Sequence, residues 1–423
     1  MSVFVGDGRT QLVDPANLRS VDKQRRLVIR ALPSPRKVQV ATADALDLVL
    51  ASDVAAGTDL PAFTNSAMDG WAVVAADVAA ATGDTPVALR DGGRVHAGPT
   101  SDEGADSVTA GTTVAVMTGA PLPDGADAVV PVEHTTGAAD GAIAMHVAVE
   151  PGRHVRSAGE EISAGTVLLR AGHRITAADI GVLVATGVDQ VTAVARPRVG
   201  ILTTGDELVP AGTTLEPGQI HDSNGPMLAA MVADAGADPV RRGPIPDTMT
   251  ALTRALEDIV DDVDVVIMSG GVSAGERDHV AAAIGQLGEV ERTRLAMRPG
   301  MPQALGRIGS TTVIGLPGNP VSSFVSFEVL VRPALRLLAG RKDVLRPSVT
   351  GVLDEAVTSP EGKLEFVRVR LARRKGTWHA TLAGGQGSHM IGALSRADAL
   401  AEVPEDATEL AAGSSIRLHL LVS

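Results

Sequence analysis

The stretch VDVVIMSGGVSAGERD, residues 263–278, decides the fold of this 423-residue chain. Its first part, Val263–Met268, is apolar apart from one aspartate and predicts a strand buried on both faces. Glycine and small polar residues, Ser269–Asp278, follow at once and predict a loop. Ligands of open α/β sheets bind beyond the carboxyl ends of the strands, so this loop is a candidate binding site.

Two further strands of the same kind are each followed by a polar, glycine-rich loop. Arg198–Thr203 leads into the loop Thr204–Leu208, and Thr312–Ile314 leads into Gly315–Ser322. Helical segments separate the strands, over residues 177–187, 225–235, 247–260 and 319–338. This alternation predicts an α/β domain with a parallel sheet covered on both faces. All three loops should then lie at one edge of the sheet.

The remainder of the chain has a different pattern of residues. Short valine-rich runs alternate with glycine, aspartate and proline from Pro61 to Val149, which predicts a β-domain with tight turns. Short strands continue through Gly152–Arg174, and alternating segments from Val349 onward predict a small second β-domain. Two helices are expected before the first β-domain, over Ser20–Leu32 and Ala43–Ala55.

The composition excludes several classes of site and partner. The chain has no cysteine, which rules out disulfides, iron–sulfur clusters, thiolate zinc sites and cysteine nucleophiles. Lys plus Arg is 37 and Asp plus Glu is 50, and the net charge of −13 argues against a nucleic acid or an anionic membrane as partner. There is no signal-peptide pattern and no run of about 18 apolar residues, so we expect a cytoplasmic protein.

The loop of residues 269–278 has a physical interpretation as an anion site. Gly270 and Gly271 can adopt backbone conformations that turn N–H groups inward. Ser269 and Ser273 flank them with hydroxyl groups. The loop is therefore expected to form an anion nest.

The other two loops add a helix start and carboxylates. Asn319 is expected to cap the following helix, with Pro320 at its first position, so that free N–H groups favour a phosphate. Asp206, Glu207 and Asp278 bring carboxylates to the same rim. Carboxylates repel a phosphate unless a hard cation lies between them, so the combination implies Mg²⁺. Each loop alone is also compatible with an ordinary turn, but three such loops at one edge favour a site.

At these segments the sequence resembles the MoeA-type molybdopterin molybdenumtransferases, the family that includes the E domain of gephyrin. The resemblance covers nearly the whole chain, in the expected order. The matching stretches are NSAMDGWA (65–72), MTGAPLPDGADAVV (117–130), GEEI (159–162), TTGDEL (203–208), DSN (222–224), SGGVSAGERD (269–278), RPGMP (298–302), GLPGNPVS (315–322) and GSHM (387–390).

The resemblance implies an elongated subunit of four parts. These are an extended discontinuous linking region (20–60 and 150–176), a β-domain with NSAMDG and MTGAP (61–149), a molybdopterin-binding α/β domain (177–340) and a C-terminal β-barrel domain (341–423). It also implies a homodimer whose active site lies between the α/β domain of one subunit and the first two parts of the other. A molybdopterin adenylyltransferase and the apo-forms of molybdoenzymes would be further partners.

The reaction that the resemblance implies is the last step of molybdenum cofactor synthesis. Adenylylated molybdopterin and molybdate would react with Mg²⁺ present, giving the cofactor and AMP. Asp69, Glu207 and Asp278 match catalytic positions, and Glu207, Asp247 and Asp278 match positions that would hold Mg²⁺. The implied substrate-binding residues are Asn65, Ser66, Thr118, Gly205, Asp206, Ser269, Gly270, Gly271, Ser273, Arg298, Pro317, Gly318, Asn319 and Ser388.

Two positions depart from the family pattern. The usual lysine of the P-G-K-P stretch is Met301 here, so Arg298 or Arg156 is expected to supply the missing positive charge. The usual G-E-D has Glu161 in place of the aspartate, one methylene longer.

Two alternative functions stay open on the sequence alone. An adenylyltransferase would share the α/β fold, but the additional domains and NSAMDG argue against it. A non-catalytic paralogue or scaffold that binds molybdopterin is consistent with the loss of the lysine at Met301.

Overall fold

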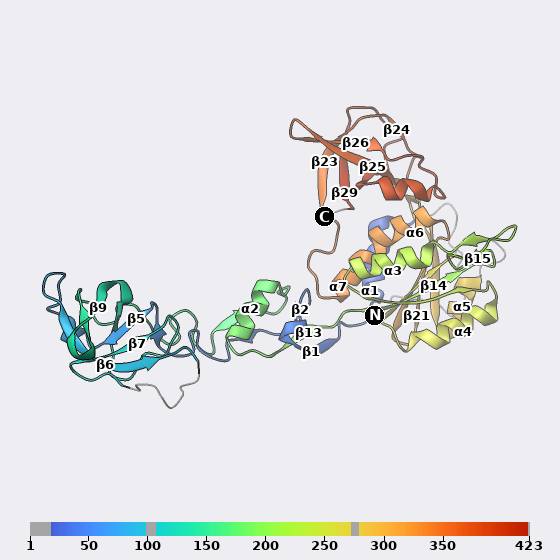
Figure 1. Ribbon diagram of the computed structural model, residues 1–423. Helices are drawn as coiled ribbons and strands as arrows, with labels where there is room; N and C mark the ends of the chain where they lie inside the picture. Colours follow the sequence, from blue (N-terminus) through green and yellow to red (C-terminus); the bar gives the residue numbers. More distant parts are fainter. Residues whose placement is uncertain (1–17, 99–106, 272–278, 422–423) are drawn as a thin grey trace. The chain divides into compact units, whose positions relative to one another are not determined.

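The computed structural model describes residues 18–98, 107–271 and 279–421. The chain divides into two compact units (Figure 1), one of residues 39–193 and one of residues 1–38 and 194–423. Within the described ranges, none of the helices has the length and apolar character that crossing a bilayer requires.

The unit of residues 39–193 is built around a six-stranded sheet with the strand order β8-β5-β7-β6-β10-β9. Its strands are β5 (Gly70–Val73), β6 (Val87–Val95), β7 (Thr112–Val116), β8 (Ala128–Pro131), β9 (Thr135–Gly137) and β10 (Ala142–Met145). Neighbouring residues point to opposite faces, so Val73 and Val130 belong to one small core and Ala72 and Val129 to another. The β-rich character predicted for residues 61–149 is confirmed.

Short strand pairs and one helix complete this unit. The pairings are β11 with β4, β12 with β3, and β13 between β1 and β2. The elements are β1 (Lys37–Ala41), β2 (Val49–Leu50), β3 (Val54–Ala55), β4 (Asn65–Ser66), β11 (Val155–Arg156), β12 (Val167–Leu169), α2 (Ala177–Ala185) and β13 (Gln190–Val194). Leu183 of α2 belongs to one buried core with Leu50 and Val54. Residues 177–193, which the sequence grouped with the α/β domain, therefore pack in this unit.

The helix predicted over Ala43–Ala55 is wrong. Thr42–Asp44 form a single 3₁₀ turn, η1, and the chain continues as β2 and β3. Asp47 has a left-handed φ of 67°, which a continuing helix cannot accommodate. The backbone N–H of Leu50 donates to the carbonyl of His173 at 2.9 Å. Pairing with a distant segment overrides the local apolar stripe.

The second unit contains the predicted α/β sheet, with the strand order β17-β14-β18-β22-β21-β19. The first four strands are parallel, and β21 is antiparallel to both of its neighbours. The bounds are β14 (Arg198–Thr204), β17 (Asp238–Ile245), β18 (Val265–Ser269), β19 (Glu289–Arg294), β21 (Pro302–Ile308) and β22 (Thr311–Leu316). The parallel sheet is confirmed for the three strands that the glycine-rich loops follow.

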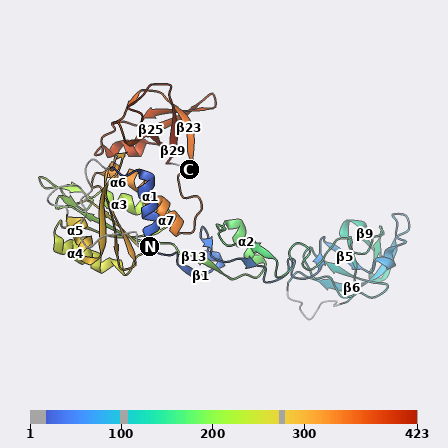
Figure 2. The ribbon, with the colours of Figure 1, turned by 180° about the vertical axis from the view of Figure 1, so that it is seen from behind.

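Helices cover both faces of this sheet (Figures 1 and 2). On one face lie α4 (Met249–Val260) and α5 (His279–Leu287). On the other lie α1 (Val21–Ala31), α3 (Asn224–Asp234) and the run of α6 (Pro320–Ser326), the π-helical η5 (Phe327–Val331) and α7 (Arg332–Leu338). Side chains of β14 alternate accordingly, because Ile201 shares a core with Leu228 of α3 and Leu202 shares one with Leu252 of α4.

The C-terminal part of this unit is a closed β-barrel, as expected. β25, β26, β23, β29 and β27 pair in succession, β27 pairs back to β25, and β20 adds to β25. The barrel strands are β20 (Met297–Arg298), β23 (Ser348–Leu353), β25 (Leu364–Arg374), β26 (Thr377–Leu382), β27 (Ala399–Val403) and β29 (Ser415–Leu420). Shorter elements of the unit are β15 (Leu208–Val209), β16 (Ile220–His221), β24 (Val357–Thr358), η6 (Ile391–Arg396) and β28 (Glu409–Leu410).

Candidate functional site

The three glycine-rich loops meet at the carboxyl ends of β14, β18 and β22. A Cβ atom added to Gly270 would lie 2.5 Å from the carbonyl oxygen of Thr204. One added to Gly318 would lie 3.5 Å from the Cα of Gly270. The loops therefore approach one another backbone to backbone, as the sequence predicts.

The loop after β14 presents carboxylates. A Cβ atom on Gly205 would lie 2.6 Å from Oε2 of Glu207, so the glycine makes room for that exposed side chain. Oδ1 of Asp206 accepts the backbone N–H of Asp247 at 2.9 Å, and Thr204 Oγ1 donates to Asp247 Oδ1 at 3.4 Å. Three of the predicted acidic residues are thus gathered beside the end of β14.

The loop after β18 agrees with the predicted anion nest only in part. Gly270 and Gly271 have the expected left-handed φ values of 112° and 57°. The N–H of Gly270, however, donates to the carbonyl of Leu316 at 3.3 Å and so is not free for an anion. It extends the β18–β22 pairing by one residue. Ser273 and Asp278 lie outside the described residues.

The loop after β22 corrects the prediction for Asn319. This residue occupies the N-cap of α6, with Pro320 following it, but its side chain makes no capping hydrogen bond. Its Nδ2 instead donates to Oγ of Ser388 at 3.1 Å, and the carbonyl of Ser388 accepts the N–H of Val321. Ser388, from the C-terminal part of the chain, is thereby held against this loop.

A ready-made metal site is not present in the described part of the chain. No group of three or more His, Asp or Glu side chains there is arranged to hold an ion. Asp278, one of the three predicted Mg²⁺ ligands, lies outside these ranges, so the Mg²⁺ site stays a prediction.

Four of the predicted residues, Asn65, Ser66, Asp69 and Thr118, lie in the unit of residues 39–193. Asp69 Oδ1 accepts hydrogen bonds from the backbone N–H and from Oγ1 of Thr118, at 2.6 and 2.8 Å. These bonds hold the pKa of Asp69 below its ordinary value. Asn65 and Ser66 are buried and bond to the carbonyls of Phe63 and Met68, so they shape the loop that presents Asp69.

Thr118→Val is expected to raise the pKa of Asp69 part of the way back to its ordinary 3.8, because the backbone donor remains while the hydroxyl donor is lost. The side-chain carboxyl chemical shift, followed by NMR over pH, measures this change. Thr135→Val removes another exposed hydroxyl in the same unit and should leave the titration unchanged. An unshifted pKa in Thr118→Val would contradict the assigned pair.

Comparison with known proteins decides the family. Family models match along the chain: the MoeA N-terminal region (domain I and II) at residues 19–187, the probable molybdopterin binding domain at 200–337, and the MoeA C-terminal region (domain IV) at 350–421. The chain belongs to the MoeA family.

Relatives across bacteria and an archaeal structure agree with this membership. "Molybdopterin molybdenumtransferase 2" of Mycobacterium tuberculosis is 42% identical over 409 residues, 95% of this chain and 99% of that protein. The molybdopterin molybdenumtransferase of Haemophilus influenzae is 31% identical over 95% of this chain and 99% of its own length. A crystal structure of the Pyrococcus horikoshii MoeA protein superposes with a TM-score of 0.80 at 31% identity, covering 96% of this chain and all of that one. This MoeA chain is a transferase of molybdenum cofactor biosynthesis.

Met301, where the resemblance implies a lysine, lies beside a positive charge. Nε and Nη2 of Arg294 lie 3.2 and 3.0 Å from the sulfur of Met301. Arg298, which the sequence proposed as the substitute, forms an ion pair with the buried Glu365 at 3.4 Å. Arg294 therefore joins Arg298 and Arg156 as a candidate for the missing cation.

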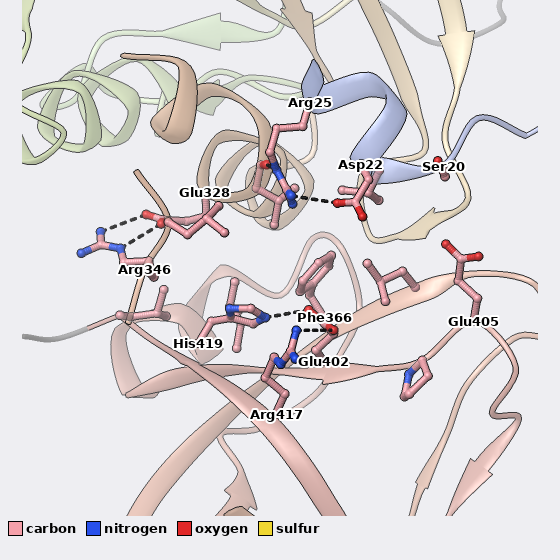
Figure 3. A pocket seen from close by; sticks show the side chains of 17 residues that line it. Ser20, Asp22, Arg25, Glu328, Arg346, Phe366, Glu402, Glu405, Arg417 and His419 are labelled. Carbon is pink, nitrogen blue, oxygen red and sulfur yellow. Dashed lines mark hydrogen bonds and ion pairs between the residues drawn. The ribbon is translucent and has the colours of Figure 1, made fainter. Parts of the chain in front are cut away.

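A cavity of about 420 Å³ in the unit that contains the α/β sheet is lined by none of the predicted site residues. It lies between α1, η5 and the barrel, and most of its charged side chains form pairs with one another (Figure 3). The pairs are Arg25 with Asp22 at 2.8 Å, Arg346 with Glu328 at 2.9 Å and His419 with Glu402 at 2.7 Å.

Glu402→Gln is expected to lower the free energy of unfolding by about 1 kcal/mol at neutral pH, because the bond from His419 then lacks a charged acceptor. That bond holds the pKa of Glu402 below its ordinary 4.5. The carboxylate therefore stabilises the fold above pH 4.5, and this contribution is lost as pH falls through the lower folded-state value. Urea unfolding at several pH values should show a shallower acid decline in the variant. Glu405→Gln changes an exposed residue that lines the same cavity, and its free energy of unfolding should depend on pH as that of the wild type does.

Some residues that organise the loops were missed by the sequence-based site assignment. Asp222 accepts Thr203 Oγ1 through one carboxylate oxygen and the N–H of Gly225 through the other, each at 2.9 Å. Ser323 and Asn224 bond to the loops after β18 and β22. The DSN stretch resembled the family, but nothing local to it indicates which distant loops it contacts.

Proposed function

We propose that this MoeA chain inserts molybdenum into adenylylated molybdopterin and releases AMP, in a Mg²⁺-dependent final step of cofactor synthesis. The observation that carries the proposal is the meeting of three glycine-rich loops with Asp206, Glu207 and Asp247 at the carboxyl end of one parallel sheet. Phosphate-bearing ligands of open α/β sheets bind at this place. The names of the mycobacterial relatives, at 42% and 34% identity, agree with molybdenum transfer.

We assign some of these residues to substrate binding and others to catalysis. Gly318, Asn319 and Ser388 lie together and would bind the phosphates through backbone and hydroxyl groups. The carboxylate of Asp206 is engaged by the N–H of Asp247. Glu207 is exposed, so we assign to it the ordering of the attacking oxygen nucleophile as the phosphoanhydride is cleaved. Asp69 would be the further catalytic carboxylate.

Mg²⁺ suits the donors at this rim, which are carboxylate oxygens. Glu207, Asp247 and Asp278 would hold it, and when bound it would offset the charge of the departing AMP. Such compensation is needed because the chain has a net charge of −13 and its proposed substrates are anions.

A homodimer is part of the proposal, with Asp69 and Thr118 acting on the site of the partner subunit, and the cytoplasm is the expected location. Light scattering after gel filtration should give twice the chain mass of 43.2 kDa. A monomeric mass for an active enzyme would contradict the shared site.

The decisive experiment follows AMP release from adenylylated molybdopterin by the purified chain. AMP is expected only when molybdate and Mg²⁺ are both present, and EDTA should abolish it. Absence of AMP above the enzyme-free background would sink the proposal and favour a non-catalytic molybdopterin-binding protein. Adenylylation of molybdopterin with ATP by this chain alone would instead indicate an adenylyltransferase.

A further inference from the structure

Asn224, the first residue of α3, connects two of the loops of the candidate site. Its side-chain Nδ2 donates to Oγ of Ser269 at 2.9 Å and to the carbonyl of Gly318 at 2.7 Å. Ser269 ends β18 and Gly318 lies in the loop after β22. One buried amide, 9% exposed, thus bridges the ends of two neighbouring strands.

The hydrogen bonds that start at Asn224 continue through two buried hydroxyl groups, those of Ser269 and Ser323. Ser269 Oγ accepts from Asn224 and lies 2.9 Å from Ser323 Oγ, and one of these two hydroxyl groups donates to the other. The carbonyl of Pro317 lies within hydrogen-bond distance of both hydroxyl groups, at 2.8 Å from Ser323 Oγ and 3.4 Å from Ser269 Oγ. The relay from Asn224 to Pro317 fixes both the spacing and the orientation of the two loops.

Where the described parts of the two loops come closest, both residues are glycines. Gly270 and Gly318 approach closely, and neither has a side chain with which to hold the other. Asp222, two residues earlier, binds the hydroxyl of Thr203 at the end of β14 and the N–H of Gly225, the residue that follows Asn224. The ends of β14, β18 and β22 are therefore connected through the start of α3.

The amide oxygen of Asn224 indicates that this residue has a role besides packing. Its Oδ1 is buried and has no hydrogen-bond donor among the described residues. Burying an amide oxygen in this way costs free energy, so Asn224 is not the residue that stability by itself would favour.

We infer that Asn224 is a positioning residue for phosphate binding, which sets the distance between residues 269–271 at the end of β18 and residues 317–319 after β22. This inference rests on the proposed function. A displacement of about 1 Å in a binding loop can cost a factor of about 100 in rate, so loss of the relay should be visible in function as well as in stability.

The test compares Asn224→Asp and Asn224→Ala with wild type, by AMP binding in calorimetry and by AMP release from adenylylated molybdopterin. Asn224→Asp keeps the side-chain shape but cannot donate a hydrogen bond when ionised, and Asn224→Ala removes the amide group. Both variants should therefore bind AMP at least about tenfold more weakly and lose about 100-fold in kcat/KM. Ser323→Ala, which cuts the relay at its far end without touching Asn224, should lose about three- to tenfold in AMP affinity.

Thr311→Val is the matched control. It removes two buried hydrogen bonds, to the carbonyls of Val260 and Val263, at the opposite end of β22. It should lower the unfolding temperature but leave AMP affinity and kcat/KM unchanged, with all measurements made well below that temperature.

The outcomes separate the inference from the proposed function. Asn224 variants that bind AMP as wild type does, while folded, overturn the inference, as does wild type that does not bind AMP at all. If wild type binds AMP and the variants do not, but no chain turns over, the inference stands and the proposed function fails. If wild type turns over and the Asn224 variants match it, only the inference fails.

Discussion

Glu207→Gln is expected to lower the rate of AMP release by about 100- to 1000-fold, the cost of removing one group that acts on the transition state. The amide has the size of the carboxylate, so Gly205 still makes room for it. It carries no charge, however, and can neither accept a proton from the nucleophile nor bind a cation well. The side chain is exposed, and the structural hydrogen bond of this residue is through its carbonyl to Ile220 N–H, so the fold should be unaffected.

Initial rates of AMP release test the predicted loss of activity, and the unfolding temperature tests whether the fold is unaffected. Glu257→Gln, an equally exposed change on α4 of the same unit, is the control and should retain wild-type rates. Full activity of Glu207→Gln would show that the carboxylate assignment is wrong.

Gly270→Ala should lower the free energy of unfolding by about 3 kcal/mol and abolish AMP release. Two effects combine at this position. The φ of 112° is unfavourable for any residue with a side chain, and the added Cβ would lie 2.5 Å from the carbonyl oxygen of Thr204. Because the Cβ position is fixed by the backbone and the oxygen is a backbone atom, relief requires the backbone at Thr204 and at Gly270 to move apart.

Gly309→Ala separates the two effects. Gly309 also has a left-handed φ, 57°, but no atom lies within 4 Å of its added Cβ. It should lose only about 1 kcal/mol, the cost of the backbone conformation, and retain activity. Urea unfolding and AMP release measure both variants. Equal losses in the two would mean that the contact of Gly270 with Thr204 has no energetic consequence.

Much of the candidate site was predictable because it follows from local pattern. Arg198–Thr203 and Val263–Met268 are apolar without alternation, which is typical of strands covered on both faces. Parallel strands end at one edge, so the loops that contain Gly205, Gly270 and Gly318 had to be neighbours.

The errors occurred where a residue has a partner far along the chain. Residues 43–55 have a helical stripe but pair with the segment around His173. Asn319 has the ideal position for a cap, yet its amide binds Ser388, 69 residues later. The N–H of Gly270 was expected to face an anion but pairs with Leu316. In each case a local propensity of modest size yields to long-range hydrogen bonds.

The sequence by itself determined the α/β alternation, the edge at which the loops lie and the absence of thiolate chemistry, because these depend on periodicity and composition. Only the tertiary structure decided how the loops are connected. The relay from Asn224 through Ser269 and Ser323 joins residues from three separate segments, and no local pattern specifies which donors and acceptors meet once the chain has folded.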